Sequence, residues 1–206
     1  NFKKFNTINY HLEENIMRKT LLILTIICIT FVTTACVNKF AVQELNNKAQ
    51  EMLKTGNVEG AIARLESSID LDESVFETHY NLAVAYMQAD KYDKALKSLE
   101  KVIELNPDFA DAYHSTAVCY EEQAYAIISG EADKDKDKAE EVSEDKAKVL
   151  TAEEKAKVCE LFGAAVDYYN KYLSKKQDAT DADKVNAKIE TLNTEMKKYS
   201  DESSES

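Results

Sequence analysis

The sequence contains few residues that interrupt helices and no cluster of basic residues. Its 206 residues include one proline and four glycines, and 26 lysines and arginines are outnumbered by 38 aspartates and glutamates. Proline and glycine are the residues least compatible with a helix interior, whereas the abundant alanine, leucine, glutamate and lysine favour helices. The composition therefore predicts an all-α protein. The net charge of −12 and the lack of basic clusters argue against nucleic-acid binding.

Sequence signatures of catalysis are also lacking. The chain contains no glycine-rich phosphate loop, no nucleophile elbow and no zinc-binding motif. His79 and His114 would not bind a metal ion without a third ligand, and His79 is most simply a packed core residue. We therefore expect no enzymatic activity, no metal and no cofactor.

Two apolar patterns of helical period stand next to each other between residues 76 and 109. The polar residues 88–91 separate them, and Pro107 ends the second because proline cannot donate the helical hydrogen bond. This arrangement predicts a helical hairpin. The apolar positions are His79, Leu82, Ala83 and Tyr86 in the first helix and Tyr92, Ala95, Leu96, Leu99, Val102 and Ile103 in the second.

This hairpin resembles the tetratricopeptide repeat, a unit of about 34 residues with small and aromatic residues at fixed offsets. The residues at those offsets are His79, Leu82, Ala83, Tyr86, Ala95, Leu99, Val102 and Pro107. Ala83 and Ala95 would lie where the two helices cross closely, since a larger side chain would hold them apart. The resemblance implies an α-solenoid whose first helices line a concave binding surface.

The same period extends in both directions and predicts about three repeats. Their bounds are 42–75, 76–109 and 110–176, and a charged insertion at 130–150 interrupts the third. The residues from Thr151 to Glu154 have the pattern of a capping box, which marks the start of a delayed second helix.

An amphipathic helix is predicted at the C-terminal end, at residues 180–199. Such a helix would cover the exposed end of the solenoid. The repeats and this helix together would form one domain at residues 42–199. The acidic, serine-rich residues 200–206 are expected to be disordered.

An apolar segment near the N-terminus resembles an export signal. Met17, Arg18 and Lys19 precede the twelve residues from Leu21 to Val32, which are too few to span a bilayer because spanning takes roughly 20 helical residues. Residues 1–16 are expected to be an upstream extension that is not native, since Met17 is the better start.

The residues that follow, Thr33 to Cys36, resemble the lipobox of bacterial lipoproteins. This resemblance implies a signal peptide at residues 17–35, acylation of Cys36 and a short tether at residues 36–41. The alternative is an uncleaved signal-anchor helix in which Cys36 has no special role.

Two further patterns leave alternatives open. Asp133, Asp135, Asp137 and Glu144 have the spacing of an EF-hand calcium loop, but Lys138 occupies the glycine position, and a solvated charged run would match by accident. Cys119 and Cys159 could form a disulfide in an oxidising compartment, or could remain two buried thiols.

The resemblance to the repeat family places a partner-binding groove on the first helices. The matching residues are Asn46, Gln50, Tyr80, Asn81, Val84, Met87, His114 and Val118. This mildly apolar surface suits an extended peptide or a helix. The lysine and arginine clamp that some relatives use for a C-terminal carboxylate is not matched, because Asn46, Asp111 and Ser115 occupy three of its sites. Recognition of chaperone tails is therefore not expected.

Taken together, these patterns predict a non-catalytic protein–protein interaction adaptor of the bacterial cell envelope. The protein would be exported and anchored by lipid to the cell membrane or outer membrane, on the periplasmic or extracytoplasmic face. One alternative is a pilotin-like assembly factor for a pilus or an outer-membrane machine. The other is a calcium-responsive module that uses the acidic insertion.

Overall fold

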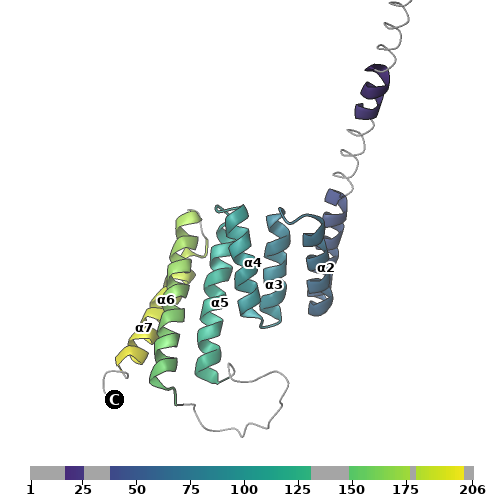
Figure 1. Ribbon diagram of the computed structural model, residues 1–206. Helices are drawn as coiled ribbons and strands as arrows, with labels where there is room; N and C mark the ends of the chain where they lie inside the picture. The colour runs from purple at the N-terminus through teal and green to yellow at the C-terminus, as the bar shows by residue number, and fades with distance from the viewer. Residues whose placement is uncertain (1–16, 26–37, 131–148, 177–179, 202–206) are drawn as a thin grey trace, which may run out of the picture. The chain divides into compact units, whose positions relative to one another are not determined.

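The computed structural model describes residues 17–25, 38–130, 149–176 and 180–201 (Figure 1). Within these ranges the regular elements are helices and no strand is present, which confirms the predicted all-α class. The chain divides into two units, Asn1–Glu44 and Leu45–Ser206. A further helix occupies residues 38–54.

The first unit contains a short helix at residues 17–25 within the predicted signal peptide. Thr20 and Thr25 each donate a hydroxyl hydrogen bond to the carbonyl three residues earlier, at 2.9 and 2.8 Å. In the part of the chain that the structure describes, no helix has the length and apolar character needed to cross a membrane.

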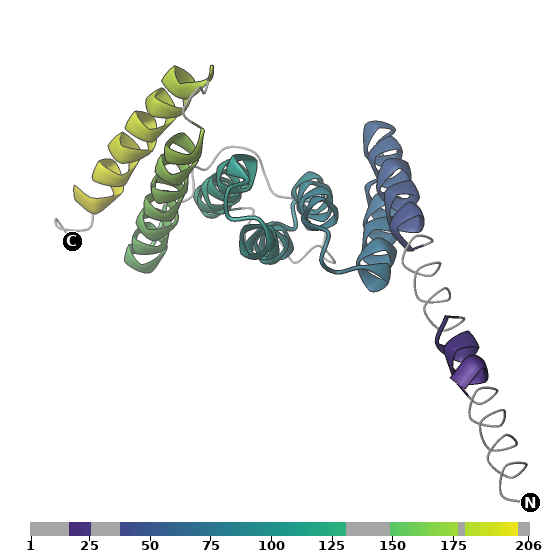
Figure 2. The same ribbon diagram turned by 90° about the horizontal axis from the view of Figure 1, so that it is seen from above.

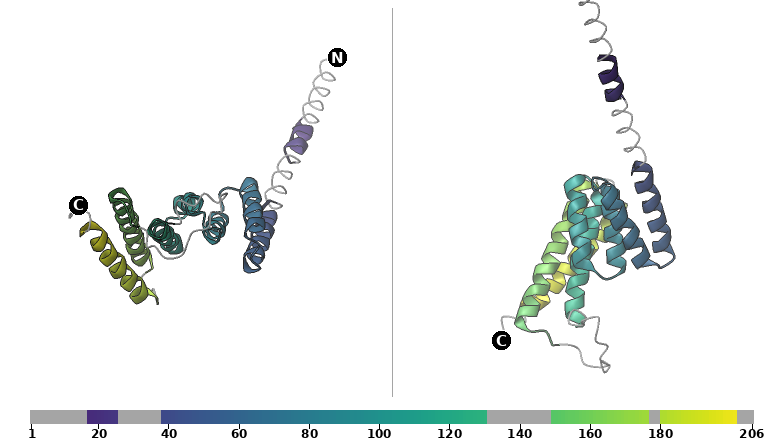
Figure 3. Two further views of the ribbon diagram at one scale, coloured as in Figure 1. Left: turned by 90° about the horizontal axis from the view of Figure 1, so that it is seen from below. Right: turned by 45° about the vertical axis from the view of Figure 1, so that its right-hand side comes forward.

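The second unit is a succession of helical hairpins. After the helix at 38–54 come α2 (Val58–Leu71), α3 (Phe76–Gln88), α4 (Tyr92–Leu105), α5 (Ala110–Ser129), α6 (Ala152–Lys175) and α7 (Ala182–Asp201). Each labelled helix packs against the next, and α3 also contacts α5 directly. Seen along the helices, α4 lies in a different layer from α3 and α5 (Figure 2; Figure 3, left). This is the predicted solenoid, with α3 and α5 as first helices of their hairpins.

Turn residues define where the helices begin and end. Asn57 caps α2 by accepting a hydrogen bond from the Gly60 amide at 3.0 Å. Between α3 and α4, Asp90 adopts a left-handed backbone conformation (φ 54°), which lets the Lys91 amide reach the Tyr86 carbonyl at 2.9 Å. Helix α4 ends at Leu105, just before Asn106 and Pro107, as the position of the proline predicts.

Small residues are fully buried where the helices cross. Ala83 and Ala95 have no exposed surface and belong to one core cluster, together with Ala61 and Leu65 of α2. Ala117 and Ala165 are equally buried in a second cluster formed by α5, α6 and α7. The burial of Ala83 and Ala95 agrees with the close crossing predicted for the second hairpin, and Ala117 and Ala165 are buried in the same way in the third.

The third hairpin is longer than the second. Helices α5 and α6 contain 20 and 24 residues, whereas α3 and α4 contain 13 and 14 (Figure 1). Gly130 ends α5 in the left-handed conformation, and Leu150 is buried in the second cluster. Both ends of the predicted insertion at 130–150 thus belong to the folded hairpin. Gly130 is the cap of α5, and the apolar Leu150 is stabilised by burial in the core. The remaining residues, 131–148, lie outside the described ranges.

The capping box predicted at the start of α6 is present. The Thr151 hydroxyl accepts from the Glu154 amide at 3.2 Å, and the Glu154 carboxylate accepts from the Thr151 amide at 2.8 Å. Helix α7 then packs along α6 with Val185, Leu192 and Tyr199 buried. This packing is what a terminal helix of a solenoid requires, since it covers the apolar side of the last repeat.

Candidate partner-binding surface

A buried network of amides and hydroxyls connects the first and second hairpins. The Asn46 amide nitrogen donates to the hydroxyls of Ser68 and Thr78, at 3.0 and 2.9 Å. Its carbonyl oxygen accepts from the Asn81 side chain at 2.9 Å, and Gln50 donates to Asn81 at 3.4 Å. Asn46 is only 9% exposed, so its polar atoms are satisfied within the protein. Its role is to orient Asn81, whereas Gln50 is exposed and accessible to a partner.

Three aromatic rings gather where α3 meets the start of α5. The Tyr80 ring meets the Phe109 ring edge-on, with centroids 4.9 Å apart and an interplanar angle of 84°. The Phe76 ring, one turn before Tyr80 on α3, also contacts the Phe109 ring, with centroids 5.1 Å apart. The Tyr80 hydroxyl is 3.3 Å from the hydroxyl of the buried Ser115 on α5. Tyr80 is thus held by two contacts while remaining partly exposed.

The apolar residues predicted for the groove differ in how they pack. Met87 packs against the first core cluster and Val118 against the second. Val84 is partly exposed and lies one turn after Tyr80 on α3, so the two side chains share one side of the helix. Tyr80 and Val84 therefore form the part of the predicted surface that combines apolar area with accessibility.

His114 is packed between two tyrosines of α6. Its ring meets those of Tyr169 and Tyr172 nearly edge-on, with centroids 5.5 and 5.1 Å apart. Burial lowers the pKa of His114, an effect that the nearby carboxylates of Asp181 and Asp111 oppose. The imidazole is therefore held mainly in its neutral form, as part of the packing between α5 and α6.

One charged contact in the third hairpin involves residues that the sequence did not predict as part of the site. The buried carboxylate of Glu121 on α5 accepts hydrogen bonds from Tyr169 of α6 and Lys188 of α7. Burial and the adjacent carboxylate raise the pKa of Tyr169 well above its usual value, and the hydrogen bond to Glu121 raises the pKa of Lys188. Glu121 thereby joins three helices through two hydrogen bonds.

The cysteines considered for a disulfide are free thiols. Cys119 is fully buried in the first core cluster, whereas Cys159 packs with the second, where its Sγ lies 3.6 Å from the Met196 carbonyl oxygen. The sequence left a disulfide between Cys119 and Cys159 open as one of two alternatives. The two thiols face different neighbours, α5 toward the second hairpin and α6 toward α7, so the possible disulfide is not formed.

Other predicted site residues lie outside the described ranges. These are the lipidation candidate Cys36 and the calcium candidates Asp133, Asp135, Asp137 and Glu144. Among the residues that are described, no three or more histidine, cysteine, aspartate or glutamate side chains converge as they would around a metal ion.

Comparison with known proteins agrees with this architecture. Residues 76–109 match the sequence profile of the tetratricopeptide repeat. A tetratricopeptide repeat and J domain-containing co-chaperone, DNJ1 of Cryptococcus neoformans var. grubii, is 26% identical over 74 residues. That match covers 36% of this chain and only 14% of the co-chaperone.

Solved tetratricopeptide-repeat domains have the same fold. The TPR2B domain of yeast Sti1, in a complex with pHsp70, superposes with a TM-score of 0.54 at 12% identity, covering 75% of this chain and 98% of the domain. The second such domain of human RPAP3, in complex with the HSP70 peptide SGPTIEEVD, gives 0.52 at 15% identity, with coverage of 74% and 98%. At these identities the similarity establishes the fold.

Proposed function

Because this chain carries a tetratricopeptide repeat at residues 76–109 and has the fold of that family, we propose that it is a non-catalytic adaptor that binds another protein. The partner would present an extended peptide to the side chains of the first helices, chiefly Gln50, Asn81, Tyr80 and Val84. We further propose that Cys36 carries a lipid, so that the adaptor acts at a membrane of the bacterial cell envelope.

The observation that carries the binding proposal is a row of two side-chain contacts across successive hairpins. Gln50 contacts Asn81, and Tyr80 contacts Ser115, so accessible side chains are fixed in position before any partner arrives. Side chains that are already ordered lose less conformational entropy on binding. Support also comes from the similar domains of Sti1 and RPAP3, whose structures contain Hsp70-derived ligands.

The mixture of groups on this row suits a peptide backbone with apolar side chains. Carboxamides such as those of Gln50 and Asn81 can both donate to a peptide carbonyl and accept from a peptide amide. The Tyr80 ring offers a large contact area with few rotatable bonds, and truncation of such rings typically weakens binding by about 2 kcal/mol or more. We therefore expect Tyr80 to dominate the affinity.

The membrane tether is supported by the sequence pattern from Met17 to Cys36. A positively charged start, a short apolar run and an alanine before cysteine are what a lipoprotein signal requires. Each buried methylene of an acyl chain contributes about 0.8 kcal/mol, and two chains together anchor a protein stably.

Chemical crosslinking in intact envelopes, followed by purification of the protein, tests the binding proposal. The double variant Tyr80→Ala/Val84→Glu should lose the captured partner while it remains helical and folded at the temperature of the experiment, although the lost ring contact with Phe109 lowers its melting temperature. A matched control, Ala63→Glu/Leu71→Ala, changes exposed residues of α2 and should retain the partner. Deletion of residues 131–148 should also retain it. If the deletion abolishes capture while Tyr80→Ala/Val84→Glu captures normally, the binding site lies in the inserted segment instead.

A further inference from the structure

Two carboxylates flank the contact between Tyr80 and Ser115. Helices α3 and α5 run in the same direction, because α4 returns between them (Figure 1). Glu77 precedes Tyr80 by three residues and Asp111 precedes Ser115 by four, so each lies one turn nearer the N-terminus on the same side of its helix. Both carboxylates are exposed. The Tyr80 and Ser115 hydroxyls are 3.3 Å apart, so each of these carboxylates belongs to a residue one turn from a member of this contact.

Aromatic rings occupy the space beside these carboxylates. Phe76, Tyr80 and Phe109 form a chain of ring contacts at 4.9 and 5.1 Å, and all three are partly exposed. The face of an aromatic ring is electronegative and attracts lysine and arginine side chains. A ring cluster bordered by carboxylates therefore favours a positively charged group by two independent interactions.

The polar residues further along the row carry no positive charge. Gln50, Asn81 and Ser115 are neutral, so a carboxylate of a partner would meet Glu77 and Asp111 without a compensating cation from them. Like charges brought close together weaken binding and exclude the wrong partner. The chain as a whole, at −12, adds long-range repulsion of acidic segments and attraction of basic ones.

Two lysines at the end of α6 already approach this region, and Lys175 lies with its Nζ 2.7 Å from the carboxylate of Asp108, the residue before Phe109. Lys176, just after α6, lies with its Nζ 3.4 Å from the Asp111 carboxylate, and the two side chains are 45% and 51% exposed. An exposed ion pair at this distance contributes little to stability and opens readily. Lys176 therefore acts as an internal competitor that a cation of the partner can replace at Asp111.

We propose that this surface selects a basic segment, in which a lysine or arginine next to an apolar residue enters between Glu77 and Asp111 and lies against the Tyr80 and Phe109 rings. This inference rests on the proposed peptide-binding function and specifies its ligand class. The ligand is opposite in charge to the acidic end of the peptide SGPTIEEVD seen with the RPAP3 domain.

Three pools of short degenerate peptides test the charge preference. Each pool has leucine, valine or phenylalanine around one fixed position, which is lysine, glutamine or glutamate, and binding to the full chain in mild detergent is followed by fluorescence anisotropy. The lysine pool should bind about three- to tenfold more tightly than the glutamine pool, as expected for one or two exposed charge pairs. The glutamate pool should bind most weakly, and added salt should reduce the difference.

Three variants locate the preference on the protein. Glu77→Gln/Asp111→Asn should weaken the lysine pool about three- to tenfold and leave the glutamine pool unchanged. The control Glu190→Gln removes an exposed carboxylate from α7 and should change neither pool. Lys176→Met removes the internal competitor and should strengthen binding of the lysine pool.

The outcomes separate this inference from the function on which it rests. If all pools bind equally and Tyr80→Ala weakens all of them, the peptide site stands and the selection of basic segments is wrong. Tighter binding of the glutamate pool would overturn the selection of basic segments in the same way. If no pool binds in a manner that depends on Tyr80, the proposed peptide site itself is wrong. A lysine preference that survives Glu77→Gln/Asp111→Asn also overturns the assignment to these carboxylates.

Discussion

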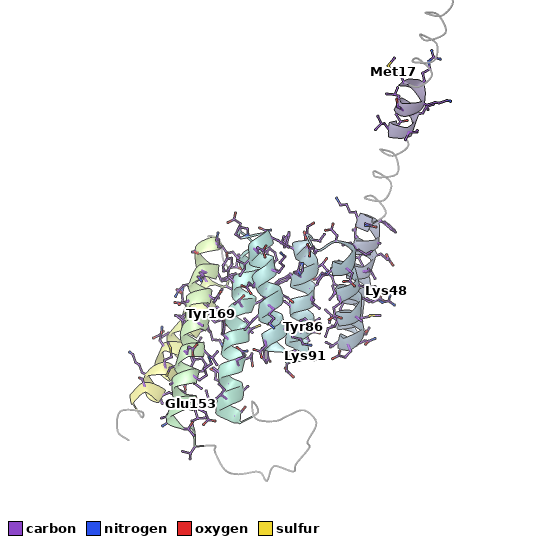
Figure 4. All side chains as sticks on the ribbon, in the orientation of Figure 1. Met17, Lys48, Tyr86, Lys91, Glu153 and Tyr169 are labelled. Carbon is purple, nitrogen blue, oxygen red and sulfur yellow. The ribbon has the colours of Figure 1, made fainter. Side chains whose placement is uncertain are left out.

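Tyr169 of α6 donates a hydrogen bond to the Glu121 carboxylate of α5 over 2.9 Å, in the interior of the third hairpin (Figure 4, where Tyr169 is labelled). The other oxygen of this carboxylate accepts from Lys188 of α7 at 2.8 Å. The Glu121 side chain is only 6% exposed, so hydrogen bonds from these two donors take the place of contacts with water. A buried carboxylate that loses its cation is costly, and this makes α7 part of the fold rather than an appendage.

Replacement of Lys188 should therefore weaken the third hairpin. In Lys188→Met the methylenes are retained but Glu121 loses its cation. Because Lys188 is 45% exposed, water can partly compensate, and we expect the free energy of unfolding to fall by about 1–2 kcal/mol, less than for a fully buried pair. Urea unfolding followed by circular dichroism measures this change. The control Lys184→Met, at an exposed position of α7, should be neutral; equal effects of the two would contradict the role of the pair.

The close crossing of α3 and α4 makes a second prediction. Ala83 and Ala95 have no exposed surface, so a leucine at either position would force the helices apart. Overpacking of this kind typically costs about 1–3 kcal/mol, and the melting temperature of Ala83→Leu or Ala95→Leu should fall accordingly. Ala63→Leu places the same side chain at an exposed position of α2 and should leave the melting temperature nearly unchanged. Wild-type melting of both buried variants would show that the crossing tolerates larger residues.

The packing of His114 predicts how stability depends on pH. Burial lowers its pKa in the folded state below the value of about 6.5 found in an unfolded chain. Well above pH 6.5 the His114 imidazole is neutral in both the folded and the unfolded state, and its contribution to the free energy of unfolding is fully present. Below this pH the unfolded state takes up the proton first, so stability falls by at most about 1.4 kcal/mol per pH unit until the folded-state pKa is reached. The charged groups around the ring are Asp111, Glu121, Lys176 and Asp181.

Comparison with a variant isolates this effect. His114→Phe keeps an aromatic ring between Tyr169 and Tyr172 but cannot be protonated, so its stability should change less between pH 7 and pH 5. Asp72 and Asp181, whose pKa values are lowered by hydrogen bonds from Ser74 and Tyr172, lose their contributions only below about pH 4. Parallel curves for wild type and His114→Phe between pH 7 and pH 5 would assign the pH dependence to other groups.

The lipid anchor proposed at Cys36 is tested by fractionation. Cys36→Ala removes the thiol that would carry the lipid, so the protein should leave the membrane fraction or accumulate as an unprocessed precursor of lower mobility. Cys28→Ala, within the apolar run, serves as the control and should behave as wild type. If Cys36→Ala fractionates and migrates as wild type, the proposed lipidation is wrong.

Much of the fold could be predicted from local sequence patterns. Helix ends depend on residues within one turn, so Pro107 and the capping box at Thr151 located two of them directly. The buried alanines followed from the spacing of small residues in the repeat. Lys48 stands where the second repeat has the buried Leu82, and it is tolerated because its side chain is exposed (Figure 4).

The contacts within the candidate site were harder to predict, because they join residues that are distant in sequence. Glu121 and Lys188 are 67 positions apart, and no local pattern pairs them. Asn46 was expected to face a partner, but the choice between solvent and a hydroxyl pair on two other helices depends on the rotation of its helix. The same sensitivity to helix rotation explains why the possible disulfide is not formed. Cys119 packs in the first core cluster, whereas Cys159 packs against the second.

Because these two thiols pack against different helices, their alkylation rates report two different opening motions of the third hairpin. Burial raises the pKa of Cys119 to about 12, so this thiol does not react readily with alkylating reagents while it stays in place. Burial also raises the pKa of the partly exposed Cys159, which slows its alkylation. In a background of Cys28→Ser and Cys36→Ser, alkylation of Cys119 reports the separation of α5 from the second hairpin. Alkylation of Cys159 reports the release of α7 from α6. The two rates therefore measure whether the solenoid opens first at its middle or at its end.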